Sequence, residues 1–189
     1  MGATIVTSGG QLDEAEVAAL IAGTHGDPFA RLGLHKAGKK WLARAIVPGA
    51  ERVDAADLGG RPLGTLTKRG ATPFFEGPVT AAGETVLRYT ATSGQSTWGF
   101  IDPYTFGPVL GPLDDYYSAE GTHLRLFDKL GAHLLVHQGV RGVNFAVWAP
   151  NARRVSVVGD FNDWDGRRHV MRHRTSGVWE LFLPELDPG

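Results

Sequence analysis

The sequence predicts a mainly β chain built of two β-sandwiches. Three observations support this class: short apolar segments separated by turn residues, a block of strands that recurs, and helical periodicity confined to two stretches. The 26 glycines and 11 prolines are spread along the chain, which indicates many turns between short strands. A length of 189 residues suffices for one large domain or two small ones.

The composition excludes several classes of function. The net charge is −1, so no global field favours nucleic acid or an anionic membrane. The absence of cysteine excludes disulfides, thiolate-bound zinc and a cysteine nucleophile. No apolar run reaches the roughly 20 residues that span a bilayer, and the N-terminus lacks the pattern of a signal peptide. We therefore expect a cytoplasmic protein without nucleic-acid or membrane partners.

A short helix is expected within an N-terminal extension over residues 1–24. Asp13 and the glutamate three residues later have the spacing of a capping box, with aspartate in place of the usual serine or threonine. Val17 and Leu20 then fall on one helical face, and Gly23 can end the helix.

The first sandwich is expected over residues 25–106. Within it, short segments bounded by glycine, proline or serine predict six strands. They are WLARAIV (41–47), RVDAADL (52–58), GTLTKR (64–69), PFFEG (73–77), TVLRYTAT (85–92) and TWGFI (97–101).

A helical linker over residues 107–132 is expected to join the two sandwiches. Leu124, Phe127 and Leu130 recur there at helical spacing, and Gly131 can end the helix. The second sandwich is expected to follow over residues 133–189. Its predicted strands are 133–138, 142–149, 153–160 and 177–183.

The two blocks of strands resemble each other. The frame Pro-x-Ala-x-Arg-Val occurs at 48–53 and again at 150–155, a shift of 150 − 48 = 102 residues. An aromatic residue followed by glutamate then recurs in the same order, at 75–76 and at 179–180. Further strands follow this pair in the first block, whereas few residues follow it in the second. We therefore expect an incomplete second sandwich with unpaired strand edges.

The second block contains the residues VNFAVWAPNARRVSVVGDFNDWDG (143–166) and GVWELFLPEL (177–186). On these residues it resembles the N-terminal sandwich of glycogen-branching and debranching enzymes. That sandwich is a starch- and glycogen-type carbohydrate-binding module. Residues 99–133 resemble the segment that joins the two N-terminal sandwiches of bacterial 1,4-α-glucan branching enzymes. Residues 25–35 resemble the opening of the first of these sandwiches. The resemblance implies two immunoglobulin-like sandwiches, and the few residues after the second aromatic–glutamate pair indicate that the second is truncated.

The resemblance also implies an activity for the intact enzyme. Such enzymes cut an α-1,4-glucan and transfer the released chain to a 6-hydroxyl through a covalent glycosyl-enzyme intermediate. Their catalytic barrel follows the second sandwich and typically needs about 250 residues, which do not fit in this chain. We therefore expect no catalytic residue and no cofactor here, and a chain that is inactive alone. Its expected partners are α-1,4-glucan or glycogen and its own catalytic domain.

The loop VVGDFNDWDG (157–166) carries the candidate site. No metal site is expected, because placing Gly166 at position 6 of a calcium loop puts Phe161 at position 1. Its three acids suit a turn that bonds to its own backbone better than a catalytic pair. Trp164 offers a flat apolar face to a glucose ring, and Asn162 offers a donor and an acceptor to hydroxyls. The resemblance implies that Trp164 belongs to the sugar-contacting surface.

Alternatives stay open for these aromatic residues and for the chain. Trp164 could instead pack against the sandwich core or the catalytic domain. Trp148 and Trp179 lie in strand patterns and are candidates for core or interdomain packing. The chain could also be a stand-alone glycogen-binding regulatory module, or a structural buttress that never contacts sugar.

Overall fold

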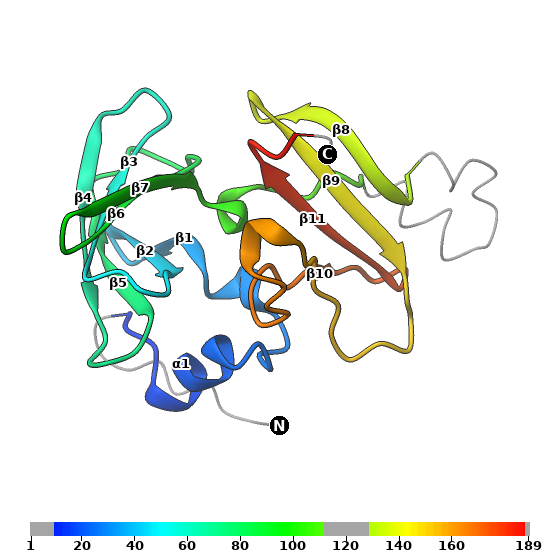
Figure 1. The fold of residues 1–189 in the computed structure, drawn as a ribbon, viewed down its shortest axis with the longest axis horizontal. Helices are drawn as coiled ribbons and strands as arrows, with labels where there is room; N and C mark the ends of the chain where they lie inside the picture. Colours follow the sequence, from blue (N-terminus) through cyan, green and yellow to red (C-terminus); the bar gives the residue numbers. More distant parts are fainter. Residues whose placement is uncertain (1–9, 112–128, 188–189) are drawn as a thin grey trace. The chain divides into compact units, whose positions relative to one another are not determined.

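The computed structural model describes residues 10–111 and 129–187, which fall into two compact units (Figure 1). Unit 1 takes in most residues up to Thr105, and unit 2 takes in the residues from Phe106 onward. Both units are built from antiparallel strands, which confirms the mainly β class. Within the described ranges, no helix has the length and apolarity needed to cross a membrane.

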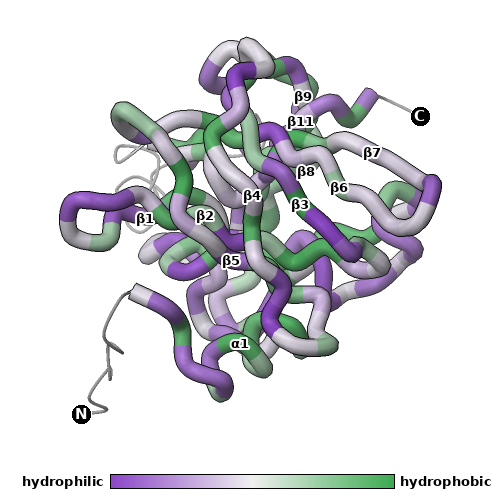
Figure 2. The backbone as a smooth tube through the Cα atoms, turned by 90° about the vertical axis from the view of Figure 1, so that its left-hand side faces the viewer, coloured by the Kyte–Doolittle hydropathy of each residue, from purple (hydrophilic) through white to green (hydrophobic). Residues whose placement is uncertain are grey.

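Unit 1 begins with α1 (Glu14–Ile21), close to the helix that the sequence predicts. The Asp13 carboxylate caps it by accepting a hydrogen bond from the backbone N–H three residues later, at 2.7 Å. Val17 and Leu20 are buried and pack with Phe74 in a small apolar cluster. In Figure 2 the hydrophilic residues that lead into α1 are purple and the helix is largely green.

The strands of unit 1 form one antiparallel sheet in the order β1-β2-β5-β4-β3-β6-β7. They are β1 (Gly33–Ala37), β2 (Lys40–Ile46), β3 (Arg52–Ala56), β4 (Pro62–Lys68), β5 (Phe74–Val79), β6 (Arg88–Ser93) and β7 (Ser96–Ile101). The start of β4 pairs with β3 and its end pairs with β5, so the sheet folds into two layers. Side chains from both layers meet in a shared core that includes Val53, Phe75 and Tyr89, all fully buried.

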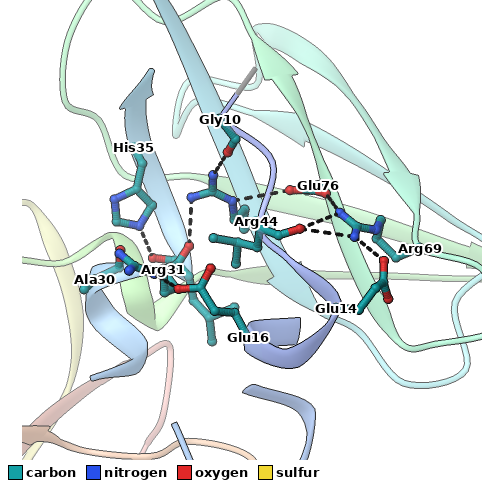
Figure 3. Close-up of polar contacts among 11 residues, drawn as sticks. Gly10, Glu14, Glu16, Ala30, Arg31, His35, Arg44, Arg69 and Glu76 are labelled. Carbon is teal, nitrogen blue, oxygen red and sulfur yellow. Dashed lines mark hydrogen bonds and ion pairs between the residues drawn. The ribbon is translucent and has the colours of Figure 1, made fainter. Parts of the chain in front are cut away.

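A buried ionic network lies on the other face of β2 and β5 (Figure 3). Arg44 and Glu76 are direct cross-strand partners, 5% and 4% exposed, and their side chains approach to 3.5 Å. Glu76 also pairs with Arg69. Arg44 donates to the Gly10 carbonyl, and Arg69 donates to the Leu12 carbonyl at 3.2 Å. The network therefore fastens the segment that precedes α1 onto the sheet.

Unit 2 contains a four-stranded antiparallel sheet in the order β10-β11-β9-β8. Its strands are β8 (Gly131–His137), β9 (Val140–Trp148), β10 (Arg172–His173) and β11 (Val178–Pro184). Central strand β11 is buried on both faces, from Val178 to Leu183. Edge strand β8 alternates between half-buried and exposed residues, and its exposed side chains include Leu134 and Val136.

The segment 106–110 is held against the sheet of unit 2 by a buried carboxylate. Glu180 is 2% exposed and accepts hydrogen bonds from the N–H groups of Val109 and Leu110, both at 3.0 Å. Arg174 pairs with Glu180 at 3.1 Å and donates to the Leu110 carbonyl at 3.0 Å. This segment therefore belongs structurally to unit 2.

The predicted strand over 153–160 is wrong. In its place, Ser156 makes a single bridge to Val170, flanked by a hydrogen bond on either side. The pairing stops there because the chain turns at Gly159 into the short 3₁₀ helix η4 (Asp160–Asn162). The valine-rich residues 155–158 thus lead into a turn and do not form a strand.

Three further differences concern strand β1, the start of the predicted linker and Gly131. Strand β1 was not predicted, because its residues GLHKA lack the apolar alternation of a half-buried strand. In the predicted linker, residues 107–111 are not helical, and the stretch 112–128 lies outside the described residues. Gly131, which was predicted to end a helix, instead begins β8 with a φ of 101°.

Candidate functional site

The 157–166 loop is closed by hydrogen bonds between residues at or near its two ends. The Val157 N–H donates to the His169 carbonyl at 3.1 Å, and the Ser156 hydroxyl donates to the Gly166 carbonyl at 2.7 Å. At the tip of the loop, Asp163 and Trp164 have φ values of 56° and 55°. Non-glycine residues seldom adopt this left-handed region, and such conformations concentrate at functional sites.

Asn162 is buried inside this loop and stabilises it through hydrogen bonds. The sequence predicts Asn162 as a sugar-binding residue, and the structure corrects that prediction. Its side chain is 0% exposed. The amide oxygen accepts from the Gly159 N–H at 3.0 Å, and the amide nitrogen donates to the Val157 carbonyl at 2.8 Å. Because these groups are buried and already bonded, they are closed to a sugar hydroxyl.

Trp164 stands at the outside of the same loop. Its side chain is 66% exposed, and its indole N–H donates to the Asp160 carboxylate at 2.8 Å. The backbone N–H of Trp164 donates to the Gly159 carbonyl at 3.1 Å. The indole is therefore exposed yet fixed at both its backbone and its nitrogen, which lowers the entropy lost when a flat ligand stacks on it.

The three acids of the loop each bond to a residue of the loop or to an arginine directly after it. Asp160 accepts from the Trp164 indole, and Asp163 pairs with Arg168 at 3.3 Å. Asp165 accepts from both the side chain and the backbone of Arg167, and this hydrogen bonding lowers the pKa of Asp165 to about 2. These carboxylates therefore shape the loop and orient its indole, as their spacing in a turn indicates.

Two other exposed apolar side chains lie in the loop, Val158 and Phe161, each 40% exposed. The Phe161 ring lies against Gly159, so closely that a Cβ at Gly159 would come within 2.5 Å of a ring carbon. A side chain at Gly159 would therefore require the Phe161 ring to move. Phe161 was missed by the sequence reasoning, although the aromatic residue directly after Gly-Asp was a signal that could have identified it.

The two tryptophans predicted to pack, Trp148 and Trp179, differ in their exposure to solvent. Trp179 of β11 is 4% exposed, and its indole N–H donates to the Ala149 carbonyl at 3.0 Å. Its ring contacts the His173 ring, with centroids 4.6 Å apart. Trp179 is thus a core residue of unit 2 and is not available for packing between domains. Trp148, at the end of β9, is 57% exposed and presents a free surface.

Both units match known protein families. Residues 13–104 match the family described as alpha-1,4-glucan branching enzyme GlgB, N-terminal domain. Residues 129–189 match Carbohydrate-binding module 48 (Isoamylase N-terminal domain), and this match contains the 157–166 loop. The loop with the exposed Trp164 therefore lies in a module of a carbohydrate-binding family.

Curated relatives extend the similarity over nearly the whole chain. The 1,4-alpha-glucan branching enzyme GlgB of Rhizobium meliloti is 60% identical over 181 residues, which are 95% of this chain and 25% of that enzyme. The enzyme of the same name from Mesorhizobium japonicum is 58% identical over 98% of this chain and 26% of its own length. The chain thus spans about a quarter of the length of these relatives. It belongs to the 1,4-alpha-glucan branching enzyme family, as the N-terminal region that joins the GlgB N-terminal domain to a module of family 48.

Proposed function

We propose that this chain is the glucan-binding and domain-positioning region of a glycogen branching enzyme. The whole enzyme would cut α-1,4-glucan chains and transfer them to 6-hydroxyls as new branches in the cytoplasm. Similarity along the chain to enzymes named for this activity supports the proposal. We assign no catalytic residue to the chain. Its contribution would be to hold a long glucan near the catalytic domain.

The exposed and immobilised indole of Trp164 is the observation that carries this proposal. An aromatic face stacks on the C–H face of a glucose ring, and burying both surfaces is favourable. Asp160 keeps the indole in place through the hydrogen bond of 2.8 Å, and its carboxylate is itself exposed. With Asn162 buried, the polar contacts to sugar hydroxyls would come from exposed groups such as Asp160.

Replacing Trp164 by alanine is expected to weaken glycogen binding by about tenfold or more, the typical cost of removing a central aromatic contact. The measurement is migration of the 189-residue chain in native gels cast with increasing glycogen. Trp98→Ala is the matched control, because Trp98 is also exposed but lies in unit 1. Unchanged retardation of Trp164→Ala would refute the role of the loop, and no retardation of the unsubstituted chain would favour a structural buttress.

A second role is proposed for Trp148, as a packing surface for the rest of the enzyme. Trp148 is 57% exposed at the end of β9, which leaves the apolar face of its indole without a cover among the described residues. We expect Trp148→Ala to migrate in glycogen gels like the unsubstituted chain. If its retardation falls as far as that of Trp164→Ala, Trp148 is part of the glucan surface instead.

A further inference from the structure

His169 follows the 157–166 loop, here called the Trp164 loop, and contacts it through both its ring and its backbone. Its ring nitrogen Nδ1 is 2.9 Å from the side-chain nitrogen of Asn162. The same ring contacts Phe161, with centroids 5.5 Å apart. Its backbone carbonyl accepts from the Val157 N–H at 3.1 Å. His169 is thus linked to the start, the middle and an exposed side chain of the loop.

The hydrogen bonds of Asn162 determine the state of the His169 ring. An asparagine amide nitrogen carries two protons and accepts none. One of these protons is donated to the Val157 carbonyl, so the other is left for the His169 nitrogen. Nδ1 must then be an unprotonated acceptor, with the ring proton on Nε2. Burial agrees with this neutral state, because it lowers the pKa of His169 to about 4.

A series of hydrogen bonds leads from this acceptor to the backbone of Trp164. His169 accepts from the Asn162 amide nitrogen, and the oxygen of the same amide accepts from the Gly159 N–H at 3.0 Å. The Gly159 carbonyl in turn accepts from the backbone N–H groups of Asn162 and Trp164, both at 3.1 Å. Without the Nδ1 acceptor, one amide proton of Asn162 would be buried with no partner, and only the bonds to Gly159 and Val157 would still hold the amide in the loop.

We propose that His169 is a positioning residue that holds the Trp164 loop in its sugar-binding geometry through Asn162. The inference deepens the proposed glucan-binding role and rests on it. It predicts that glucan binding also depends on His169, a residue that makes no contact with the sugar. The expected loss on removing the acceptor is about tenfold in glucan affinity, as for one unsatisfied buried hydrogen bond.

Two substitutions isolate the acceptor. His169 has a φ of 49°, so both replacements must tolerate the left-handed region. Asparagine and glycine both do, and both remove the ring that contacts Phe161. Only asparagine keeps an acceptor, its Oδ1, near the position of Nδ1. A difference between His169→Asn and His169→Gly therefore reports the hydrogen bond and not the ring or the backbone.

The experiment measures β-cyclodextrin affinity by calorimetry and the Trp164 indole N–H signal by ¹H–¹⁵N NMR on the 189-residue chain. We expect His169→Gly to weaken binding by about tenfold and to shift the indole signal, and His169→Asn to stay within about threefold of the unsubstituted chain. Equal losses in both variants, or none in His169→Gly, would overturn the inference.

The indole signal needs no sugar, which separates this inference from the proposed function. If the unsubstituted chain fails to bind β-cyclodextrin, the proposed function fails, while the shift of the signal in His169→Gly still decides the positioning role. If His169→Gly does not fold, the ring tautomer of the unsubstituted chain decides. Long-range ¹H–¹⁵N spectra must show an unprotonated Nδ1, and a proton on Nδ1 would overturn the inference.

Discussion

Replacing Glu76 by glutamine is expected to lower the free energy of unfolding of unit 1 by about 3–5 kcal/mol, the range seen when one partner of a buried ion pair is removed. Glu76 lies between Arg44 and Arg69, and both guanidinium groups also hold backbone carbonyls of the segment before α1 (Figure 3). Burial lowers the pKa of Arg44, and the neighbouring Glu76 carboxylate opposes that shift. Glutamine would leave this buried cation without its counter-charge.

Urea unfolding with and without the substitution measures this effect, and Asp54→Asn is its control. Asp54 also pairs with an arginine, Arg52, at 2.7 Å in the same unit, but that pair is exposed to solvent. Exposed pairs contribute little, so Asp54→Asn should unfold at nearly the same urea concentration as the unsubstituted chain. Equal effects of the two substitutions would show that the buried network does not hold α1 and the sheet together.

Replacing Asp102 by asparagine is expected to stabilise unit 1 at pH 8 by about 2–4 kcal/mol. Asp102 is 3% exposed; its Oδ1 accepts from the Tyr104 N–H at 2.9 Å, and its Oδ2 has no hydrogen-bond partner in the described part of the chain. Burial raises the pKa of Asp102 to about 7, although the Tyr104 N–H and the nearby Tyr89 hydroxyl oppose the shift. Asparagine keeps the acceptor and carries no charge.

The sign of the pH dependence follows from this raised pKa. Between about pH 4 and about pH 7 the folded state binds the Asp102 proton more tightly than the unfolded state does. The stability of unit 1 should therefore fall as pH rises through this window, and Asp102→Asn should flatten the fall. Thermal unfolding at several pH values measures it, with the exposed Glu84→Gln as control. A steeper fall in Asp102→Asn would contradict the assignment.

The regular elements of the fold were predictable where local pattern and burial agree. Six strands of unit 1 and the helix α1 form close to their predicted bounds, because apolar spacing and turn residues both mark them. Strand β1 was not predictable in this way, since it is a polar edge strand held by pairing with β2. The run at 153–160 has strand propensity, but the buried side chain of Asn162 turns the backbone away.

The sequence could predict which loop carries the candidate site, and the binding role of that loop stays a prediction. Trp164 is exposed, as a binding residue must be, whereas Asn162 is the internal support of the loop. Sequence alone does not separate these roles, because an asparagine in a turn suits both. The hydrogen bond between His169 and Asn162 depends on folding that brings together residues seven positions apart, so it carries no local sequence signal.

The structure explains the two glutamates of the recurring aromatic–glutamate pair. Glu76 and Glu180 are both buried in strands and both pair with arginine. Each also anchors the segment that leads into its own unit, either directly or through the arginine. The sequence pattern marked both positions, but their partners are distant in the chain and carry no local signal.

Mapping maltoheptaose onto the 189-residue chain by ¹H–¹⁵N NMR tests the glucan-binding role of the loop most directly. Sugar should cause saturable shifts that are largest at the Trp164 indole N–H and the backbone amides of the 157–166 loop, with little change in unit 1. Shifts confined to other surfaces, or an indole signal that does not move as sugar is added, would contradict it.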